Sequence, residues 1–192
     1  CQSFELVECD QLITEATFGL PVFQHPKPKN EIKKIINAFE RSEKKTYIIG
    51  AYALGKSQRV IKLLRDIGYN DTIFLHGSQV KICDYYASQG IDLGKLEPVS
   101  HKKNKDFEGK IVIAPPSALK DKWSRRFSEP VICYASGWMS IKQRAKQSLV
   151  EIPLIISDHC DWNELTATIK KCKTETVWVT HGREDALVYW CR

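Results

Sequence analysis

The sequence lacks several features that would assign it to a class at once. Its 192 residues contain no apolar run approaching the ~20 residues of a membrane-spanning helix, and the N-terminus carries no secretory signal. The seven cysteines are odd in number and have no C-x-x-C spacing, so they indicate reduced thiols rather than a disulfide framework or a structural zinc site. These absences argue against a membrane or secreted protein and predict a cytoplasmic chain.

Composition sets bounds without choosing a function. Apolar residues make up 43% of the chain and charged residues 27%, which is typical of a globular protein. The net charge of +6 suits a polyanionic partner, although many ordinary enzymes are equally basic. The chain starts at Cys1 and stops at Arg192 inside an apparent amphipathic helix, so we expect a fragment of a longer polypeptide.

Short apolar runs alternate with helical patterns along most of the chain. Thr46–Ile49 is a continuous apolar run, and the helical pattern that follows carries Val60, Ile61 and Leu64 on one face. The same unit recurs from Thr72 and from Lys110. Continuous apolar strands, each followed by a small-residue turn and a helix, predict an α/β fold whose mainly parallel sheet is covered by helices on both faces.

Gly50–Ser57 lies between a predicted strand and a helix and matches the G-x-x-x-x-G-K-[ST] pattern of a phosphate-binding P-loop. Against that interpretation, the loop interior is bulky, and the later strand Ile111–Ile113 ends in Ala114 instead of an aspartate for magnesium. The favoured interpretation is a tight strand-to-helix turn whose amides face an anion at the helix N-terminus.

Two histidines follow apolar runs near the C-terminus. His159 follows Pro153–Ile156, and His181 follows Thr176–Val179. If the two strands are neighbours, both imidazoles lie at one rim of a sheet, where α/β proteins place their chemistry. Glu15 closes the first predicted strand and could join them, so this constellation suits metal-assisted hydrolysis or acid–base catalysis. A nucleophilic Cys160 beside His159 is a weaker alternative, since adjacent residues of an extended segment point apart.

Four motifs, in order along nearly the whole chain, resemble those of metallo-β-lactamase-fold nucleases with a β-CASP insertion. Within that family the bacterial DNA-ligase-associated exonucleases, often labelled messenger-RNA 3′-end processing factors by similarity, look most alike. The motifs are Asp10–Gly19 (D-x-L-I-x-E-A-T-F-G), Ala53–Arg59 (A-L-G-K-x-Q-R), Ser157–Asp161 (S-x-H-x-D) and Thr180–Gly182 (T-H-G). Because Ala53–Arg59 is one of these motifs, the resemblance argues against interpreting Gly50–Ser57 as a P-loop.

The resemblance implies a role for each motif residue. Glu15 would orient His159, His159 would contact the scissile phosphate, and His181 would be one ligand of a pair of divalent metal ions, expected to be zinc. The H-x-H-x-D-H run that supplies most ligands in the family does not occur here. We therefore expect the metals to be mostly unbound in this chain and the chain alone to be inactive.

The implied organisation has three parts. Residues 1–20 would end the first part of the metallo-β-lactamase αββα domain, residues 21–152 would form the β-CASP domain, and residues 153–192 would return into the first domain. Candidate contacts to a nucleic-acid backbone or base are Lys56, Arg59, Trp138, Lys102, Lys103, Arg125 and Arg126.

These observations predict a metal-dependent nuclease, with a DNA exonuclease of repair favoured over an RNA-processing nuclease of the same family. The expected partners are single-stranded nucleic acid, a DNA ligase and a helicase. Two other classes stay open: a non-catalytic nucleic-acid-binding subunit, and a P-loop nucleotide-binding module built on Gly50–Ser57.

Overall fold

The computed structural model describes residues 5–42, 44–101 and 107–192, so Lys102 and Lys103 lie outside the described residues. The described residues form two compact units. Unit 1 combines the segment up to His25 with His159–Arg192, and unit 2 is Pro26–Asp158. The divisions therefore fall at 25/26 and 158/159, whereas the sequence predicted 20/21 and 152/153. The later second division follows from strand pairing, because residues 152–154 belong to the sheet of unit 2.

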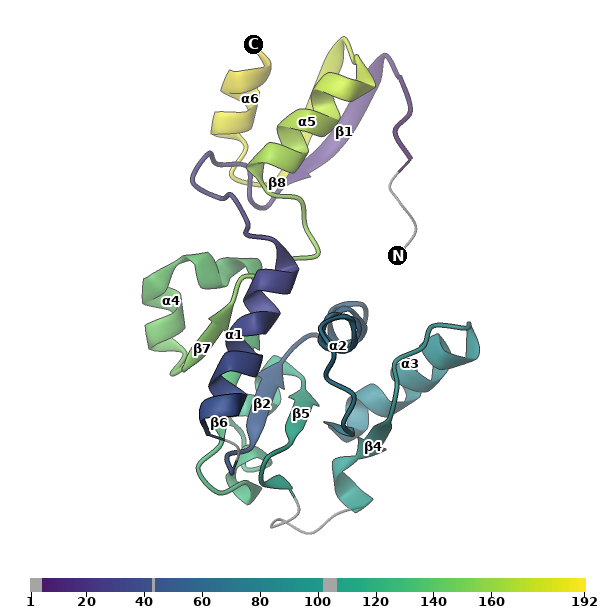
Figure 1. Ribbon diagram of the computed structural model, residues 1–192. Helices are drawn as coiled ribbons and strands as arrows, with labels where there is room; N and C mark the ends of the chain where they lie inside the picture. The colour runs from purple at the N-terminus through teal and green to yellow at the C-terminus, as the bar shows by residue number, and fades with distance from the viewer. Residues whose placement is uncertain (1–4, 43, 102–106) are drawn as a thin grey trace. The chain divides into compact units, whose positions relative to one another are not determined.

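Unit 2 is built on a six-stranded sheet in the order β4-β3-β5-β2-β6-β7, and each of these neighbouring strand pairs is parallel (Figure 1). The strands are β2 (Tyr47–Gly50), β3 (Ile73–Leu75), β4 (Leu96–Pro98), β5 (Ile111–Ala114), β6 (Val131–Ala135) and β7 (Ile152–Leu154). The helices are α1 (Pro28–Arg41), α2 (Lys56–Asp66), α3 (Gly77–Ser88) and α4 (Lys142–Gln147), with 3₁₀ turns η1 (Val99–His101), η3 (Pro116–Lys120), η4 (Ser124–Arg126) and η5 (Gly137–Ser140).

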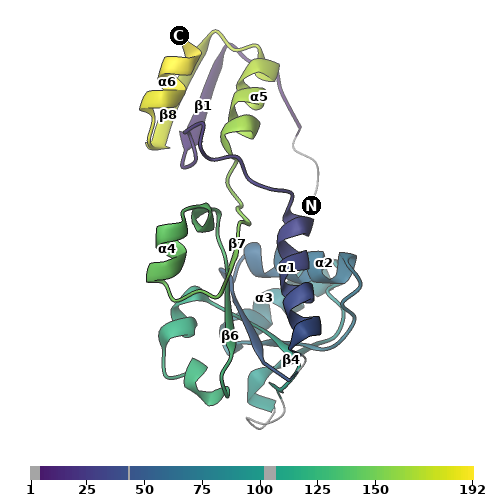
Figure 2. The same cartoon turned by 60° about the vertical axis from the view of Figure 1, so that its left-hand side comes forward.

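Both faces of this sheet are buried, which explains its continuous apolar strands. Adjacent strand residues point to opposite faces, so Ile49 packs with the apolar stripes of α1, α2 and α3, while Ile48 packs with Phe107 and Phe127 on the other side. Figure 2 shows the helices and strands of unit 2 from a second direction. The predicted mixed α/β class with a mainly parallel sheet is thus confirmed.

The chain leaves the middle of the sheet in two directions. From β2 it runs through α2 to β3, and from β5 it runs through η3 and η4 to β6, on the far side of β2. Ligand sites of open parallel sheets lie at such a switch in direction, beyond the carboxyl ends of the strands. The Gly50–Ser57 loop therefore leaves β2 at the edge of the sheet where a site is expected.

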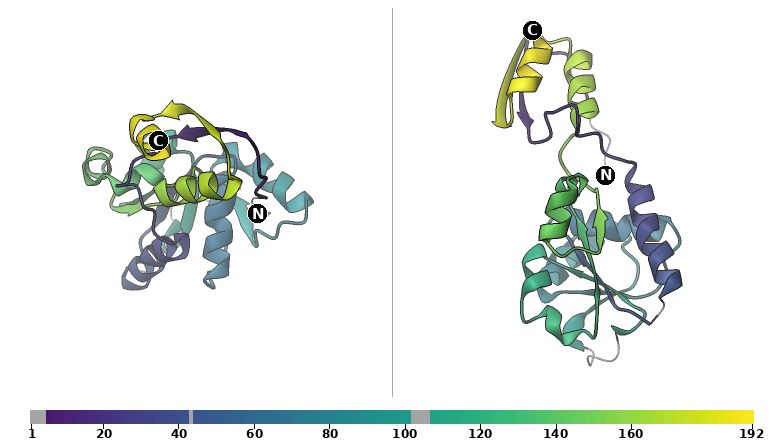
Figure 3. Two further views of the ribbon diagram at one scale, coloured as in Figure 1. Left: turned by 90° about the horizontal axis from the view of Figure 1, so that it is seen from above. Right: turned by 90° about the vertical axis from the view of Figure 1, so that its left-hand side faces the viewer.

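Unit 1 contains a parallel pair of strands, β1 (Gln11–Ala16) and β8 (Thr176–Gly182), with α5 (Trp162–Cys172) and α6 (Asp185–Cys191) (Figure 3). Alternation along the strands turns Val177 and Val179 toward the helices, where they pack around Ile169 and Leu187. The opposite positions, Ile13 and Trp178, are exposed.

One expectation about the two histidines is wrong. The strand before His159 is β7, which pairs with β6 in unit 2, whereas β8 before His181 pairs with β1 in unit 1. The two strands are therefore not neighbours. Among the described residues, no helix has the length and apolar character needed to span a membrane.

Candidate functional site

The first candidate cluster lies in unit 1 and joins Glu15 to His159. The Nδ1 atom of His159 lies 3.5 Å from Oε1 of Glu15, across more than half of the chain in sequence. The other carboxylate oxygen of Glu15 accepts a 2.6 Å hydrogen bond from the backbone N–H of Thr17. Because its own backbone neighbour holds this carboxylate, it presents a fixed acceptor to one side of the imidazole ring.

His181 is held at the same end of the strand pair by a bulge. Glu15 is in register with Thr180 and Ala16 with Gly182, so His181 is the extra residue opposite the Glu15–Ala16 step. Its φ of 56° lies in the left-handed region, which is uncommon for a residue with a side chain. Such backbone strain is concentrated at functional sites. The bulge places His181 outside the regular register of β8.

Two other residues of the Ser157–Trp162 stretch have structural or unreactive settings. Asp161 is the N-cap of α5: its Oδ1 accepts from the N–H of Glu164, and its Oδ2 accepts from the N–H of His25 at 2.7 Å. Cys160 is exposed as a residue, but its thiol is partly buried. This partial burial, followed by the nearby carboxylates, raises the pKa of the thiol and disfavours the nucleophilic thiolate.

The described residues do not fit the two-metal centre that the resemblance implies. Within those ranges, no group of three or more His, Cys, Asp or Glu side chains is arranged to hold a metal ion. A catalytic zinc needs about three protein ligands, and His181 is one imidazole. The remaining ligands would have to come from outside the described residues.

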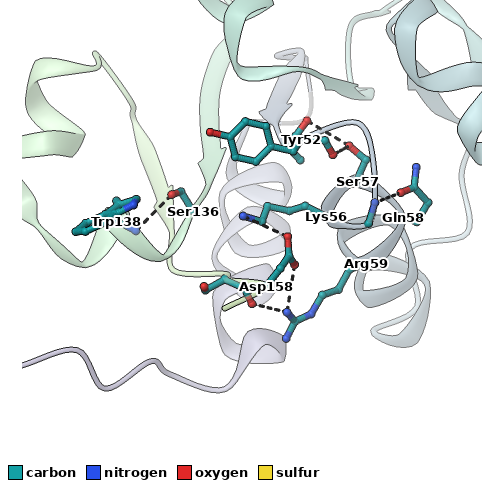
Figure 4. Close-up of polar contacts among 11 residues, drawn as sticks. Tyr52, Lys56, Ser57, Gln58, Arg59, Ser136, Trp138 and Asp158 are labelled. Atoms are coloured by element: carbon teal, nitrogen blue, oxygen red, sulfur yellow. Dashed lines mark hydrogen bonds and ion pairs between the residues drawn. The ribbon is translucent and has the colours of Figure 1, made fainter. Parts of the chain in front are cut away.

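The second candidate cluster lies in unit 2, at the start of α2 (Figure 4). The Nζ atom of Lys56 lies 3.4 Å from Oδ2 of Asp158, and the Lys56 side chain is only 6% exposed. The Arg59 guanidinium lies 3.4 Å from the other oxygen of Asp158 and also donates to the carbonyl of Ser157. These contacts anchor the segment after β7 to α2, and they occupy two cations that the sequence assigned to nucleic acid.

The Gly50–Ser57 loop uses its donors internally. The N–H of Gly55 donates to Oε1 of Gln58, and the N–H of Ser57 donates to the carbonyl of Tyr52. The Ser57 hydroxyl also donates to the Tyr52 carbonyl, at 2.8 Å. In a phosphate-binding loop these amides and this hydroxyl would face phosphate and magnesium. The observed contacts therefore argue against a P-loop.

Both glycines of the pattern have local reasons to be glycine. A Cβ at Gly50 would lie 2.5 Å from a Leu119 side-chain carbon, so close packing of η3 on β2 favours glycine there. Gly55 has a φ of 78°, which a residue with a side chain rarely adopts. The literal match to the P-loop pattern is explained by packing and backbone geometry alone.

Trp138 lies in η5, directly after β6. Its backbone N–H donates a hydrogen bond to the Ser136 hydroxyl, and the Arg144 guanidinium lies 4.1 Å from the centre of its ring system. Arg144 therefore covers one face of the indole, the usual geometry of a cation–π contact.

Asp158→Asn is expected to lower the free energy of unfolding by about 1–3 kcal/mol, because the nearly buried Lys56 ammonium loses its charged partner. Chemical denaturation measures the change. The matched control is Asp66→Asn, which removes an exposed carboxylate 3.6 Å from Lys62 on the same helix and should cost less than ~1 kcal/mol. Equal losses in the two variants would contradict an anchoring role for Asp158.

No protein-family model matches the chain, and a search of curated proteins gives no significant match. A similar solved structure is the crystal structure of a protein of unknown function from Enterococcus faecalis V583, with a TM-score of 0.56 and 10% sequence identity. The match covers 93% of this chain and 47% of that one, so the chain spans about half the length of that structure. At this identity the similarity shows the fold alone.

The sequence singled out Lys56 and Trp138 but missed the residues that contact them. Nothing in the sequence links Lys56 to Asp158, which lies about a hundred residues later in the chain. The contact between Arg144 and Trp138 could not be predicted from the sequence either. The two residues are six positions apart, and a 3₁₀ turn ends between them. The contact between Lys56 and Asp158 is made by tertiary packing.

Proposed function

We propose that the chain is part of a metallo-β-lactamase-fold nuclease with a β-CASP domain, a metal-dependent phosphodiester hydrolase acting on single-stranded nucleic acid. A DNA exonuclease working in repair beside a ligase is the favoured form. One observation carries the proposal: Glu15 and His159, from two motifs that the resemblance links, have side chains 3.5 Å apart. The register of β1 and β8 adds His181 from a third motif, next to Glu15.

The chemistry of the pair follows from which nitrogen faces Glu15. Nδ1 faces the carboxylate, and this contact would orient the imidazole. Contact with a phosphate oxygen would then be made through Nε2. A preorganised donor at that point stabilises the charge that develops on a phosphodiester during hydrolysis. Glu15 acts in this scheme as a positioning residue, and the metal pair would supply the activated hydroxide.

Unit 2 supports the nucleic-acid part of the proposal less directly. The chain is basic overall. Lys56 and Arg59 follow the carboxyl end of β2, and the half-buried Trp138 follows the carboxyl end of β6. Because Asp158 pairs with both cations, a nucleic-acid phosphate would have to compete with that carboxylate.

The test is degradation of end-labelled single-stranded DNA and of RNA of the same sequence by the full polypeptide, over a range of salt concentrations. We expect DNA to be shortened from an end, with activity falling as salt rises because counterions compete for the backbone. Much faster cleavage of RNA would favour the RNA-processing nuclease, and binding without cleavage would favour the non-catalytic subunit.

Calorimetric titration with ATP or GTP tests the P-loop alternative separately. We expect no magnesium-dependent binding at micromolar concentrations, because the loop amides and the Ser57 hydroxyl already have partners. Micromolar binding that disappears in Lys56→Ala would contradict the interpretation of Gly50–Ser57 as a strand-to-helix turn without a nucleotide site.

A further inference from the structure

Cys9 and Cys172 meet at the end of the β1–β8 pair that is opposite to Glu15. The N–H of Cys9 donates a 3.2 Å hydrogen bond to the carbonyl of Cys172. The next residue, Asp10, accepts through its carbonyl from the N–H groups of Glu175 and Thr176. The segment before β1 is therefore fixed against the turn that joins α5 to β8.

This backbone contact brings the two cysteines within reach of a disulfide. A direct N–H···O=C bond keeps two α-carbons roughly 4.5–6.5 Å apart, which falls within the usual range for disulfides. The side chains are also close enough to interact, because the Cys172 thiol is among the groups that raise the pKa of Cys9. Cys9 is half-buried, whereas Cys172 is buried.

The other described cysteines have different surroundings. Cys83 is buried and contacts the side-chain amide of Gln58 at 3.3 Å, and Cys133 is fully buried in β6. Cys160 and Cys191 are exposed. Among the cysteines that the structure describes, Cys9 and Cys172 are the two whose backbones are hydrogen-bonded to each other.

We propose that Cys9 and Cys172 form an oxidative modification site at which a hydroperoxide produces an intramolecular disulfide. The Cys9 thiolate attacks one peroxide oxygen, the O–O bond breaks, and Cys9 becomes a sulfenic acid while the other oxygen leaves as hydroxide or alkoxide. The sulfur of Cys172 then attacks the sulfur of Cys9, the S–O bond breaks, and water leaves. In sum, two thiols lose two electrons and two protons to one hydroperoxide, which yields water and an alcohol, or a second water from hydrogen peroxide.

The disulfide would link the N-terminal ends of β1 and β8. In sequence, these two strands are separated by the whole of unit 2. It would restrict the unfolded chain over a very long loop, so oxidation should raise the unfolding temperature of unit 1. Glu15 and His181 lie at the other end of the strands and would keep their contacts. The inference is therefore independent of the proposed nuclease function.

The reaction should depend on pH in a set direction. Burial, followed by the neighbouring Cys172 and Asp10, raises the pKa of the Cys9 thiol. The reactive thiolate is then scarce near neutral pH, and its fraction grows about tenfold for each pH unit below the pKa. Disulfide formation at a fixed peroxide concentration should accelerate accordingly from pH 7 to pH 8.

The test is peptide mapping by mass spectrometry of the full polypeptide, treated with hydrogen peroxide and then alkylated under denaturing conditions. We expect a linked peptide containing Cys9 and Cys172, present also in Cys160→Ser and lost in Cys9→Ser. The unfolding temperature should rise on oxidation of the unsubstituted protein and of Cys160→Ser, but not of Cys9→Ser.

Either of two results would overturn the proposal. One is that Cys9 and Cys172 both remain open to alkylation at a peroxide dose that oxidises the exposed Cys160. The other is that Cys9 is joined to any cysteine except Cys172. Mapping of the unsubstituted protein alone decides between these outcomes, so the proposal stays testable even if a substituted chain folds poorly.

Discussion

His159→Ala in the full polypeptide is expected to lower nuclease activity by about 10²–10³-fold, the usual cost of losing one preorganised donor to a developing negative charge. The loss should appear mainly in kcat, since the donor is needed most in the transition state. Glu15→Gln should give a smaller loss in the same parameter, because the imidazole remains but its carboxylate partner, 3.5 Å away, becomes neutral.

A matched control separates this effect from the general loss of an imidazole. His76 caps the N-terminus of α3 in unit 2 by accepting from the N–H of Ser78, and asparagine can make the same capping bond. His76→Asn should therefore keep both fold and activity. Loss of activity in His76→Asn as large as in His159→Ala would remove the special role assigned to His159.

Gly182→Ala is expected to destabilise unit 1 by on the order of 3–5 kcal/mol, from strain and overlap together. A Cβ at Gly182 would lie 2.2 Å from the backbone oxygen of Ala16, and the φ of 114° is unfavourable for any residue with a side chain. The neighbouring atoms are backbone atoms of β1, so relief requires moving the strand. Hydrogen exchange of the β1 and β8 amides under mild denaturant measures the loss within unit 1.

Two other glycines serve as controls for that substitution. Gly68 has a φ of 95° but open space around a Cβ, so Gly68→Ala should cost only the backbone strain, about 1–2 kcal/mol. Gly77, in the first turn of α3, has open space and no positive φ, so Gly77→Ala should change stability little. A Gly182→Ala protein as stable as Gly77→Ala would contradict the tight bulge between β1 and β8.

The strands and the turns after them could be predicted because each depends on a short sequence pattern. Buried strands such as Ile111–Ala114 are continuous apolar runs, and each is followed by a turn that small residues or proline allow. β4 was missed, since its three residues are half-buried and end at Pro98. The start of α1 follows a local rule, because the helix begins at Pro28 and proline is favoured in the first turn.

Non-local features could not be derived in the same way. Which strands pair depends on contacts far apart in sequence, so the apolar runs before His159 and His181 do not reveal that β7 and β8 lie in different sheets. The pairing of Lys56 with Asp158 likewise required the fold. The link between Glu15 and His159 came from a resemblance between motifs, and the fold adds the distance that joins them.

The central claim is that Glu15, His159 and His181 form one end of a metal-dependent nuclease site with divided roles. Zinc and manganese content of the purified full polypeptide, measured by elemental analysis in His181→Ala and His159→Ala side by side, tests it most directly. We expect a lowered metal content in His181→Ala and an unchanged one in His159→Ala, with activity lost in both. Full metal content in His181→Ala, or metal lost in His159→Ala, would contradict it.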